Sequence, residues 1–179
     1  MSEPQETRWT DADEPRLTVV ALGSNLGESR RIIREAMSAL QQHSEIPLRR
    51  SSLWASEPVN CPSGSAWFVN AICVMQPHAG VTPEDLLGLL QQLERQFGRT
   101  PKRAHNEPRV LDLDLIAFGR ERRNTPELVL PHPRAHLRRF VLQPLAEIIP
   151  DYRLPGERQT ITELLRGLPP DIQRVQLVP

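Results

Sequence analysis

The chain is poor in cysteine and in aromatic residues, and it has no excess of charge of either sign. Its two cysteines, Cys61 and Cys73, form neither a disulfide framework nor a metal-binding motif, so both are expected to be reduced thiols. Lys plus Arg and Asp plus Glu number 22 each, which argues against a general nucleic-acid or anionic-membrane binder, because such proteins carry a global basic excess. An aromatic share of 4% also offers few rings for stacking RNA bases.

Long apolar runs and targeting signals are missing as well. No apolar run approaches the length that spans a bilayer, and the N-terminus lacks the hydrophobic core of a secretory signal. We therefore expect a cytoplasmic protein without membrane or nucleic-acid partners, present as a monomer or weak dimer. Residues 1–15 are polar and acidic and predict a disordered tail, whereas the length of 16–179 fits a single domain with its own core.

The most informative segment is 109–119, which has the pattern of a buried strand carrying two acids. Alternate strand residues share a face, so Asp112 and Asp114 lie beside each other with Val110 and Ile116, their Cα atoms about 6.6 Å apart. Neighbouring carboxylates are costly to bury unless cations compensate them. Such a pair suits Mg²⁺ shared with substrate phosphates. The alternative is an amphipathic edge strand whose acids face water.

Basic segments flank this strand on both sides. Residues 97–109 contain several cations between chain-breaking residues and predict a long, functional loop. A second, proline-bounded segment at 130–140 contains more basic side chains, namely His132, Arg134, His136, Arg138 and Arg139. Either segment alone is typical of a solvated surface. Together with the acid pair they predict a polyphosphate site, in which guanidinium groups bind phosphate oxygens.

Hydrophobic periodicity predicts strands at 17–22, 49–56, 67–76 and 109–119, and helices after Gly27 and from Thr82 to Phe97. This β-α-β-β-α-β order predicts an α+β, ferredoxin-like sandwich with helices on one face of a mainly antiparallel sheet. The pattern also predicts extra elements after this core, which are a short strand at 127–130, a helix over 141–148 interrupted near Pro144, and a capping box at Thr160–Glu163. The glycine-rich turn at 23–27 either cradles phosphate or is a plain connection.

Polar side chains at two further places are candidates for ligand contacts. Asn70 lies on an otherwise apolar strand face with Phe68, where an unsatisfied amide costs about 1–3 kcal/mol. It either satisfies the backbone of a neighbouring loop or pairs with the edge of a heterocyclic ligand. Gln91 and Glu94 are one helical turn apart and are directed toward the start of the basic loop.

Several short motifs together resemble the 6-hydroxymethyl-7,8-dihydropterin pyrophosphokinase family of folate biosynthesis, over roughly Thr18 to Tyr152. The matching segments are Ala21–Leu26, Phe68–Asn70, Gln91–Arg99, Pro108–Asp114 and Pro131–Phe140. Their order, spacing and chemistry carry the resemblance jointly. It implies transfer of the β,γ-pyrophosphoryl unit of ATP to the pterin hydroxymethyl group, with release of AMP.

The resemblance also implies roles for individual residues. Asp112 and Asp114 correspond to ligands of two Mg²⁺ ions that bind with ATP, and Arg99 and Arg109 to catalytic arginines. The positions that match ATP contacts are Gln91, Glu94, Arg99, Arg109, His132 and Arg138. The positions that match the pterin pocket are Ser56, Val59, Phe68, Asn70 and Phe140.

The chain departs from the family pattern at a few positions. Asn106–Glu107 stands where many relatives have Trp-Gly, Pro101 replaces a loop arginine beside Lys102 and Arg103, and Glu127 replaces an arginine of some relatives. Two alternatives remain open. One is a pyrophosphokinase that acts on a different pterin, and the other is a non-catalytic ligand-binding or RNA-binding module on a ferredoxin-like sheet.

Overall fold

A mainly antiparallel sheet forms the centre of the computed structural model, which describes residues 16–59, 64–99 and 108–179. Within these ranges the sheet has six strands in the order β5-β1-β4-β3-β8, and β2 also pairs with β4. The strands are β1 Thr18–Ser24, β2 Arg49–Arg50, β3 Trp54–Ser56, β4 Phe68–Met75, β5 Asp112–Phe118 and β8 Val175–Leu177. Every described pairing is antiparallel, as the sequence predicts.

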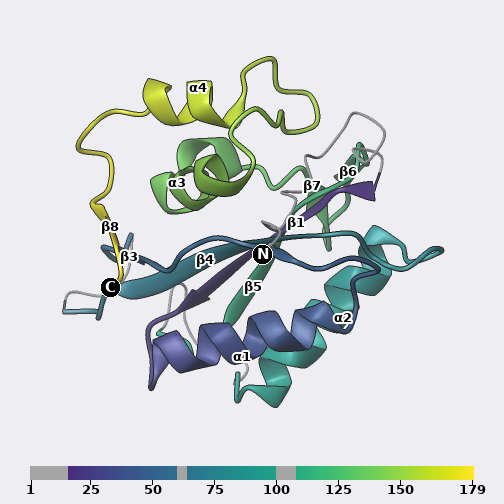
Figure 1. Ribbon diagram of the computed structural model, residues 1–179, viewed down its shortest axis with the longest axis horizontal. Coiled ribbons are helices and arrows are strands. Elements are labelled where there is room, and N and C mark those ends of the chain that lie inside the picture. The colour runs from purple at the N-terminus through teal and green to yellow at the C-terminus, as the bar shows by residue number, and fades with distance from the viewer. Residues whose placement is uncertain (1–15, 60–63, 100–107) are drawn as a thin grey trace, which may run out of the picture.

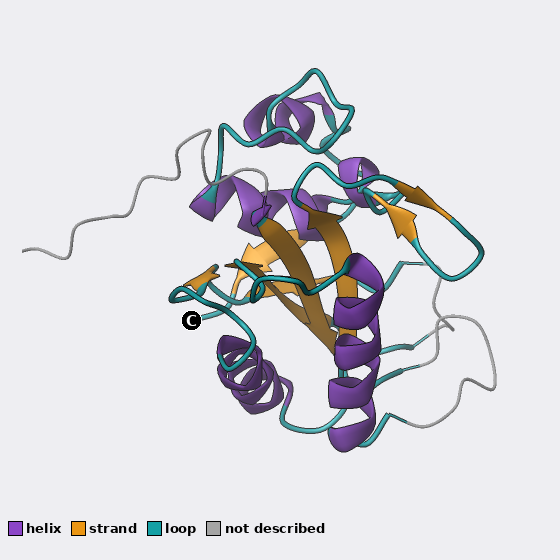
Figure 2. Ribbon diagram, turned by 90° about the vertical axis from the view of Figure 1, so that its right-hand side faces the viewer, coloured by secondary structure: helices purple, strands orange, loops and turns teal. Residues whose placement is uncertain are grey.

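Helices cover both faces of this sheet (Figure 1). Helices α1 and α2 lie on one face, and α3 and α4 lie on the other, so that the strands are seen between helical layers in the turned view (Figure 2). The helices are α1 Ser29–Gln41, α2 Pro83–Gln96, α3 Arg139–Ile148 and α4 Ile161–Gly167, with a 3-10 turn η2 Ala135–Leu137. A separate hairpin pairs β6 Arg123–Asn124 with β7 Val129–Leu130.

The expectation that the helices occupy one face holds for α1 and α2 only. Alternate residues of the central strand β1 enter two different cores: Val20 packs with α1 and α2, and Val19 packs with α3 and α4. A strand that is apolar on both sides requires a covering layer on each. The C-terminal elements α3 and α4 therefore complete the fold.

The predicted strand 49–56 is broken in two. Ser51 lies between β2 and β3, and its hydroxyl accepts the N–H of Ile72 on β4 at 2.9 Å. Because the side chain replaces a backbone partner, the regular ladder is interrupted at this point. The strand resumes at Trp54, which pairs with Asn70.

The ends of α2 follow the predicted signals. The Thr82 hydroxyl accepts the N–H of Asp85 at 3.1 Å, and the Asp85 carboxylate accepts the N–H of Thr82 at 3.0 Å. Gly98 ends the helix with φ of 92°, a conformation that favours glycine. Both ends of the helix are therefore fixed, and its C-terminal end lies just before Arg99. The capping box at Thr160–Glu163 is likewise confirmed at the start of α4.

Two further sequence expectations are decided by the fold. Helix α3 continues through Pro144 rather than being interrupted there. Proline lacks the N–H donor of one helical hydrogen bond, but Leu142 and Leu145 on either side of it are fully buried, so packing in the core stabilises this turn. Within the described ranges, no helix combines the length and apolarity needed to cross a membrane. The predicted disordered tail at 1–15 lies outside the described residues.

Candidate active site

The site lies where β1, β4 and β5 run side by side. On β1, Gly23 is opposite Asp112 of β5 and also opposite Asn70 of β4. A Cβ at Gly23 would lie 3.5 Å from the Asn70 amide oxygen and 4.0 Å from the Asp112 Cβ, so the bare backbone leaves open space between the two side chains. Asp114 lies opposite Ala21, another small residue. Small residues on β1 thus keep the sheet surface clear beside both acids.

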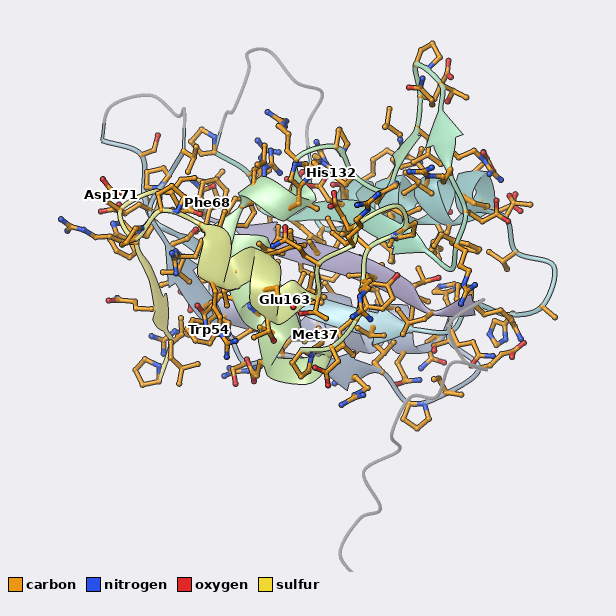
Figure 3. The ribbon with its side chains drawn as sticks, turned by 90° about the horizontal axis from the view of Figure 1, so that it is seen from above. Met37, Trp54, Phe68, His132, Glu163 and Asp171 are labelled. Atoms are coloured by element: carbon orange, nitrogen blue, oxygen red, sulfur yellow. The ribbon has the colours of Figure 1, made fainter. Side chains whose placement is uncertain are left out.

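A cavity of about 860 Å³ opens above this part of the sheet. All the residues that the sequence assigns to metal, ATP and pterin line it, namely Ser56, Val59, Phe68, Asn70, Gln91, Glu94, Arg99, Arg109, Asp112, Asp114, His132, Arg138 and Phe140. Two of them, Phe68 and His132, are labelled in the upper half of the view in Figure 3. Segments far apart in the chain therefore share one cavity.

Arginines face both acids inside this cavity. Arg99 Nη1 lies 3.1 Å from one Asp112 oxygen and Arg109 Nη1 lies 2.8 Å from the other. Arg138 Nη1 lies 3.9 Å from Asp114. Strand β5 is an edge strand, as the alternative interpretation requires, but its acids face cations in a cavity. The structure thus brings the carboxylate pair together with arginines from both basic segments.

Burial and mutual repulsion act on the acid pair. Burial raises the pKa of Asp114, the nearby Asp112 charge raises it further, and Arg138 and Arg109 oppose these effects. A carboxyl group with a raised pKa gains from any additional cation, because positive charge favours the ionised form. A cation placed beside the pair would therefore favour the ionised form of Asp114.

Glu94 on α2 holds Arg99 in place. Its Oε1 accepts the Leu113 N–H at 2.8 Å and forms an ion pair with Arg99 Nη1, while the Arg99 N–H donates to the Glu94 carbonyl at 2.9 Å. Burial raises the Glu94 pKa, and the Leu113 N–H and the Arg99 charge lower it. Arg99 thus bridges Glu94 and Asp112, and its guanidinium is fixed from two sides.

Asn25 fixes the backbone of Arg109. Its Oδ1 accepts the Arg109 N–H at 2.8 Å, and its own N–H donates to the Arg109 carbonyl at 3.1 Å. Asn25 is 6% exposed and lies in the glycine-rich turn that follows β1. The turn therefore docks an arginine-bearing segment. Sequence reasoning did not assign this role to Asn25, and its place in the Ala21–Leu26 motif was the available signal.

His132 is a neutral hydrogen-bond donor at physiological pH. Burial and the charges of Arg138 and Arg134 lower the pKa of His132 to about 4. Its Nδ1 accepts the Arg134 N–H at 3.2 Å, so the proton of the neutral ring resides on Nε2. The ring can then donate to an oxygen or nitrogen acceptor without adding charge.

The other end of the cavity is less polar. The guanidinium of Arg138 lies over the Phe140 ring, 5.3 Å from its centroid, and links the charged end to the aromatic end. The Asn70 amide donates to the Ser56 hydroxyl at 2.9 Å and to the Trp54 carbonyl at 3.3 Å. The NH₂ group of Asn70 thus satisfies a backbone carbonyl of a neighbouring segment, which is one of the two roles expected for this residue. Its oxygen is directed toward the open space above Gly23.

The cavity also contains residues that sequence reasoning did not assign. Ile172 and Gln173 belong to the C-terminal segment, which carries no motif that would have indicated them. Glu127, noted as a departure from the family, lines the cavity and is exposed. The remaining departures, Pro101–Arg103 and Asn106–Glu107, lie outside the described residues, as does Cys61.

The donor set fits a metal that is shared with a substrate. In the described part of the chain, no group of three or more His, Cys, Asp or Glu side chains is arranged to hold an ion by itself. Asp112 and Asp114 instead supply carboxylate oxygens beside an open cavity. Mg²⁺ typically takes one or two carboxylates and completes its shell with phosphate oxygens and water. The two aspartates fit this ion.

Acids and arginines at one end of the cavity, with aromatic rings and an amide at the other, define a site that combines polyphosphate binding with recognition of a flat ligand. The model of the 7,8-dihydro-6-hydroxymethylpterin-pyrophosphokinase (HPPK) family matches residues 19–150. The chain belongs to this family.

Curated relatives agree with the family match. A 2-amino-4-hydroxy-6-hydroxymethyldihydropteridine pyrophosphokinase of Pseudomonas aeruginosa is 40% identical over 151 residues, covering 84% of this chain and 90% of that protein. The enzyme of the same name from Bacillus subtilis is 38% identical over 133 residues, covering 74% and 77% of the two chains.

Solved structures share the fold. The structure of a Plasmodium falciparum HPPK-DHPS triple mutant with pteroate superimposes with a TM-score of 0.66 at 14% identity. The match covers 84% of this chain but only 43% of that longer chain. At this level of identity the likeness supports the α+β fold and nothing finer.

Proposed function

We propose that this protein transfers pyrophosphate from ATP to the hydroxymethyl oxygen of 6-hydroxymethyl-7,8-dihydropterin, giving the pterin diphosphate and AMP in folate biosynthesis. The observation that carries the proposal is the side-by-side placement of Asp112 and Asp114 on β5, facing Arg99, Arg109 and Arg138 across one cavity. The named relatives from Pseudomonas aeruginosa and Bacillus subtilis support the same reaction.

Asp112 and Asp114 hold two Mg²⁺ ions together with the ATP phosphates. When bound, the ions neutralise the polyphosphate and align the attacking and leaving oxygens. The two aspartates fix the position of the positive charge of the ions relative to the sheet. Burial and the neighbouring Asp112 charge raise the pKa of Asp114, and a bound cation would relieve this unfavourable burial and repulsion of negative charge.

The arginines bind and orient the phosphates. Arg99 is paired with both Glu94 and Asp112, and Arg109 is paired with Asp112, so these ion pairs orient the two guanidinium groups before phosphate oxygens bind to them. Phosphoryl transfer depends on alignment and charge neutralisation more than on covalent help from the protein. The other ATP contacts in this proposal are Gln91, Glu94, His132 and Arg138.

The aromatic end binds the pterin. Phe68 and Phe140 offer flat surfaces to the bicyclic ring, and Val59 adds an apolar contact at the rim of the cavity. Asn70 pairs with the polar edge of the ring, and Ser56 fixes the orientation of its amide through the 2.9 Å hydrogen bond. Enclosing the pterin beside the phosphates also excludes water, which would otherwise accept the transferred group.

The test is the Mg²⁺-dependent release of AMP from ATP and 6-hydroxymethyl-7,8-dihydropterin. Asp112→Asn and Asp114→Asn, which keep the shape of the side chain and remove the charge, should each lower the rate by on the order of 1,000-fold, because several kcal/mol of charge stabilisation are lost. Asp151→Asn is the matched control, since Asp151 is exposed and away from the cavity. Wild-type rates in both site variants would contradict the proposal.

The identity of the pterin is tested with the same assay. Running it over pterins that differ in the group at C6 should give the highest kcat/KM for the hydroxymethyl compound, because its primary hydroxyl is the nucleophile of the proposed reaction. A higher kcat/KM for another pterin would assign the chain to a different substrate within the same reaction.

A further inference from the structure

The C-terminal segment lies against the less polar end of the cavity, although it follows the family match, which ends at residue 150. Strand β8 pairs with β3, with Val175 opposite Ser56 and Leu177 opposite Trp54. Further backbone hydrogen bonds run from the Glu57 N–H to the Arg174 carbonyl at 3.2 Å and from the Val178 N–H to the Leu53 carbonyl at 2.8 Å. The segment thus follows β3 over its whole length (Figure 1).

This pairing brings the residues before β8 to the cavity. Ile172 and Gln173 line it together with Phe68 and Phe140. Asp171, which precedes them, is labelled at the same end of the molecule as Phe68 in Figure 3. Ile172 is 43% exposed, so an apolar side chain stands open at the rim. Such a side chain is available for contact with an apolar face of a ligand.

Gln173 joins two walls of the cavity through its side-chain amide. Its Nε2 donates to the Glu57 carbonyl at 3.1 Å, on the chain that leads from β3 toward Val59. Its Oε1 accepts the N–H of Phe140 at 3.3 Å, in the first turn of α3. The first N–H groups of a helix have no partner within the helix, so this acceptor satisfies one of them.

The burial of Gln173 indicates that these hydrogen bonds matter. The residue is 7% exposed, and a buried amide that loses its partners costs about 1–3 kcal/mol. An apolar side chain of similar length would fill the same space without connecting the walls. The amide therefore fixes the separation between the Phe140 backbone and the Glu57 backbone, which carry opposite sides of the pocket.

We propose that Gln173 is a positioning residue for pterin binding and that Ile172 contributes a third, apolar wall to the pterin pocket. The inference rests on the proposed function, because it assigns the pterin to this end of the cavity. Gln173 acts through Phe140 and through the segment that bears Val59. It has no role in binding ATP, whose contacts lie at the opposite, charged end.

Gln173→Met tests this role, because methionine keeps the length of the side chain and removes both hydrogen bonds. We expect the Kd for 6-hydroxymethyl-7,8-dihydropterin, measured by calorimetry with Mg²⁺ and α,β-methylene ATP, to rise about ten-fold. The Kd for the ATP analogue and kcat at saturating pterin should stay within about two-fold. Gln176→Met is the matched control, because Gln176 is an exposed glutamine on the same segment and should leave every constant unchanged.

A second readout does not depend on turnover. The Phe140 amide of Gln173→Met should exchange its hydrogen for deuterium faster than in the wild-type protein, since its acceptor is gone. Ile172→Ala, at a partly exposed position that tolerates truncation, should raise the pterin Kd about three-fold through lost apolar contact. Ile172→Ala therefore tests the apolar wall of the pterin pocket even if Gln173→Met does not fold.

The outcomes separate the inference from the proposed function. A wild-type protein that releases no AMP with any pterin overturns the function. An active wild type whose folded Gln173→Met variant binds pterin within two-fold of normal overturns the positioning role. Equal weakening of pterin and the ATP analogue also overturns it, because that result marks a general structural role. An unchanged pterin Kd in Ile172→Ala overturns the third wall.

Discussion

Asp112 receives ion pairs from two arginines that approach it along different routes. Arg99 follows the end of α2 and is held by Glu94, whereas Arg109 precedes β5 and is held through its backbone by Asn25. Each arginine side chain is less than one fifth exposed, so its charge is poorly screened by solvent. The two arginines face two carboxylates, Glu94 and Asp112, so their guanidinium groups are held in fixed positions beside the cavity.

Replacing Arg109 should damage the chemical step more than the fold. Arg109→Ala removes a guanidinium from the region where negative charge is redistributed during transfer, so kcat should fall by about 100-fold to 1,000-fold, the range seen when one such donor is lost. Steady-state AMP release at saturating ATP and pterin measures the change.

The control for this prediction is Arg31→Ala on α1. Arg31 pairs with Glu35 at 2.9 Å, but its side chain is 67% exposed, and surface pairs of this kind contribute little. Its kcat should equal that of the wild-type protein. A turnover number for Arg109→Ala close to that of Arg31→Ala would exclude Arg109 from the chemistry.

Helix α2 delivers site residues from its middle and from its end. Gln91 and Glu94 line the cavity from the helix, and the turn at Gly98 passes directly into Arg99. The start of the helix is fixed by the reciprocal hydrogen bonds of Thr82 and Asp85. The cap and the cavity residues lie at different places on one rigid element, so stability and activity can be altered separately.

Removing the cap should lower stability without changing catalysis. Thr82→Ala leaves the Asp85 N–H without its acceptor, which costs about 1 kcal/mol of unfolding free energy. Urea denaturation measures the loss, and kcat well below the melting temperature should be unchanged because Gln91 and Glu94 are not touched. Ser38→Ala, which removes an exposed hydroxyl from the middle of α1, is the control and should not destabilise. Equal stability of both variants would contradict the role of the cap.

The molecule as a whole consists of a sheet with a helical layer on each face, and the cavity opens where the end of β1 lies beside the starts of β4 and β5. Segments from β1, β4, β5, α2, α3 and the C-terminal segment all contribute side chains to it. The environment of His132 at the cavity has a consequence for the pH dependence of stability. His132 is kept neutral because it is partly buried and because the positive charges of Arg138 and Arg134 lie close to it.

Stability should therefore fall in mildly acidic solution through His132. Its pKa is about 4 in the folded protein against a reference of 6.5, so between these values the unfolded chain binds more protons and is favoured as the pH falls. The loss is complete near pH 4 and absent above about pH 7. After allowance for solvent screening, we expect about 1 kcal/mol between pH 7 and pH 5.

Chemical denaturation of the wild-type protein and of His132→Gln at pH 7 and at pH 5 measures this loss of unfolding free energy. The variant lacks the titrating ring, so its unfolding free energy should decrease by about 1 kcal/mol less than that of the wild-type protein. Identical decreases would show that His132 does not titrate abnormally.

Local sequence patterns were sufficient to predict much of the fold and of the site. The alternation of Asp112 and Asp114 within an apolar strand, the cap at Thr82 and the end signal at Gly98 depend on neighbours within a few residues. These interactions are already specified in a short segment. The order of strands and helices along the chain and the α+β class followed from the succession of such segments. The family resemblance extended this to single positions, and the cavity contains each of them.

Other contacts have no local signature. Ser51 breaks a predicted strand because its hydroxyl meets Ile72 of another strand. Asn25 meets the backbone of Arg109 from a distant part of the chain, and Gln173 meets Glu57 and Phe140. A polar side chain is compatible with many partners, and only the packing of elements selects one of them.

By itself the sequence determined which residues are acids, cations and aromatics of the site and which local segments carry them, because strand alternation and helix capping act over a few residues. Tertiary structure alone decided that α3 and α4 cover the second face of the sheet, that Arg138 approaches Asp114 and that the C-terminal segment closes one end of the cavity. The physical reason is that these contacts come from burying apolar surface between elements far apart in the chain, which fixes side-chain partners only when the whole core is assembled.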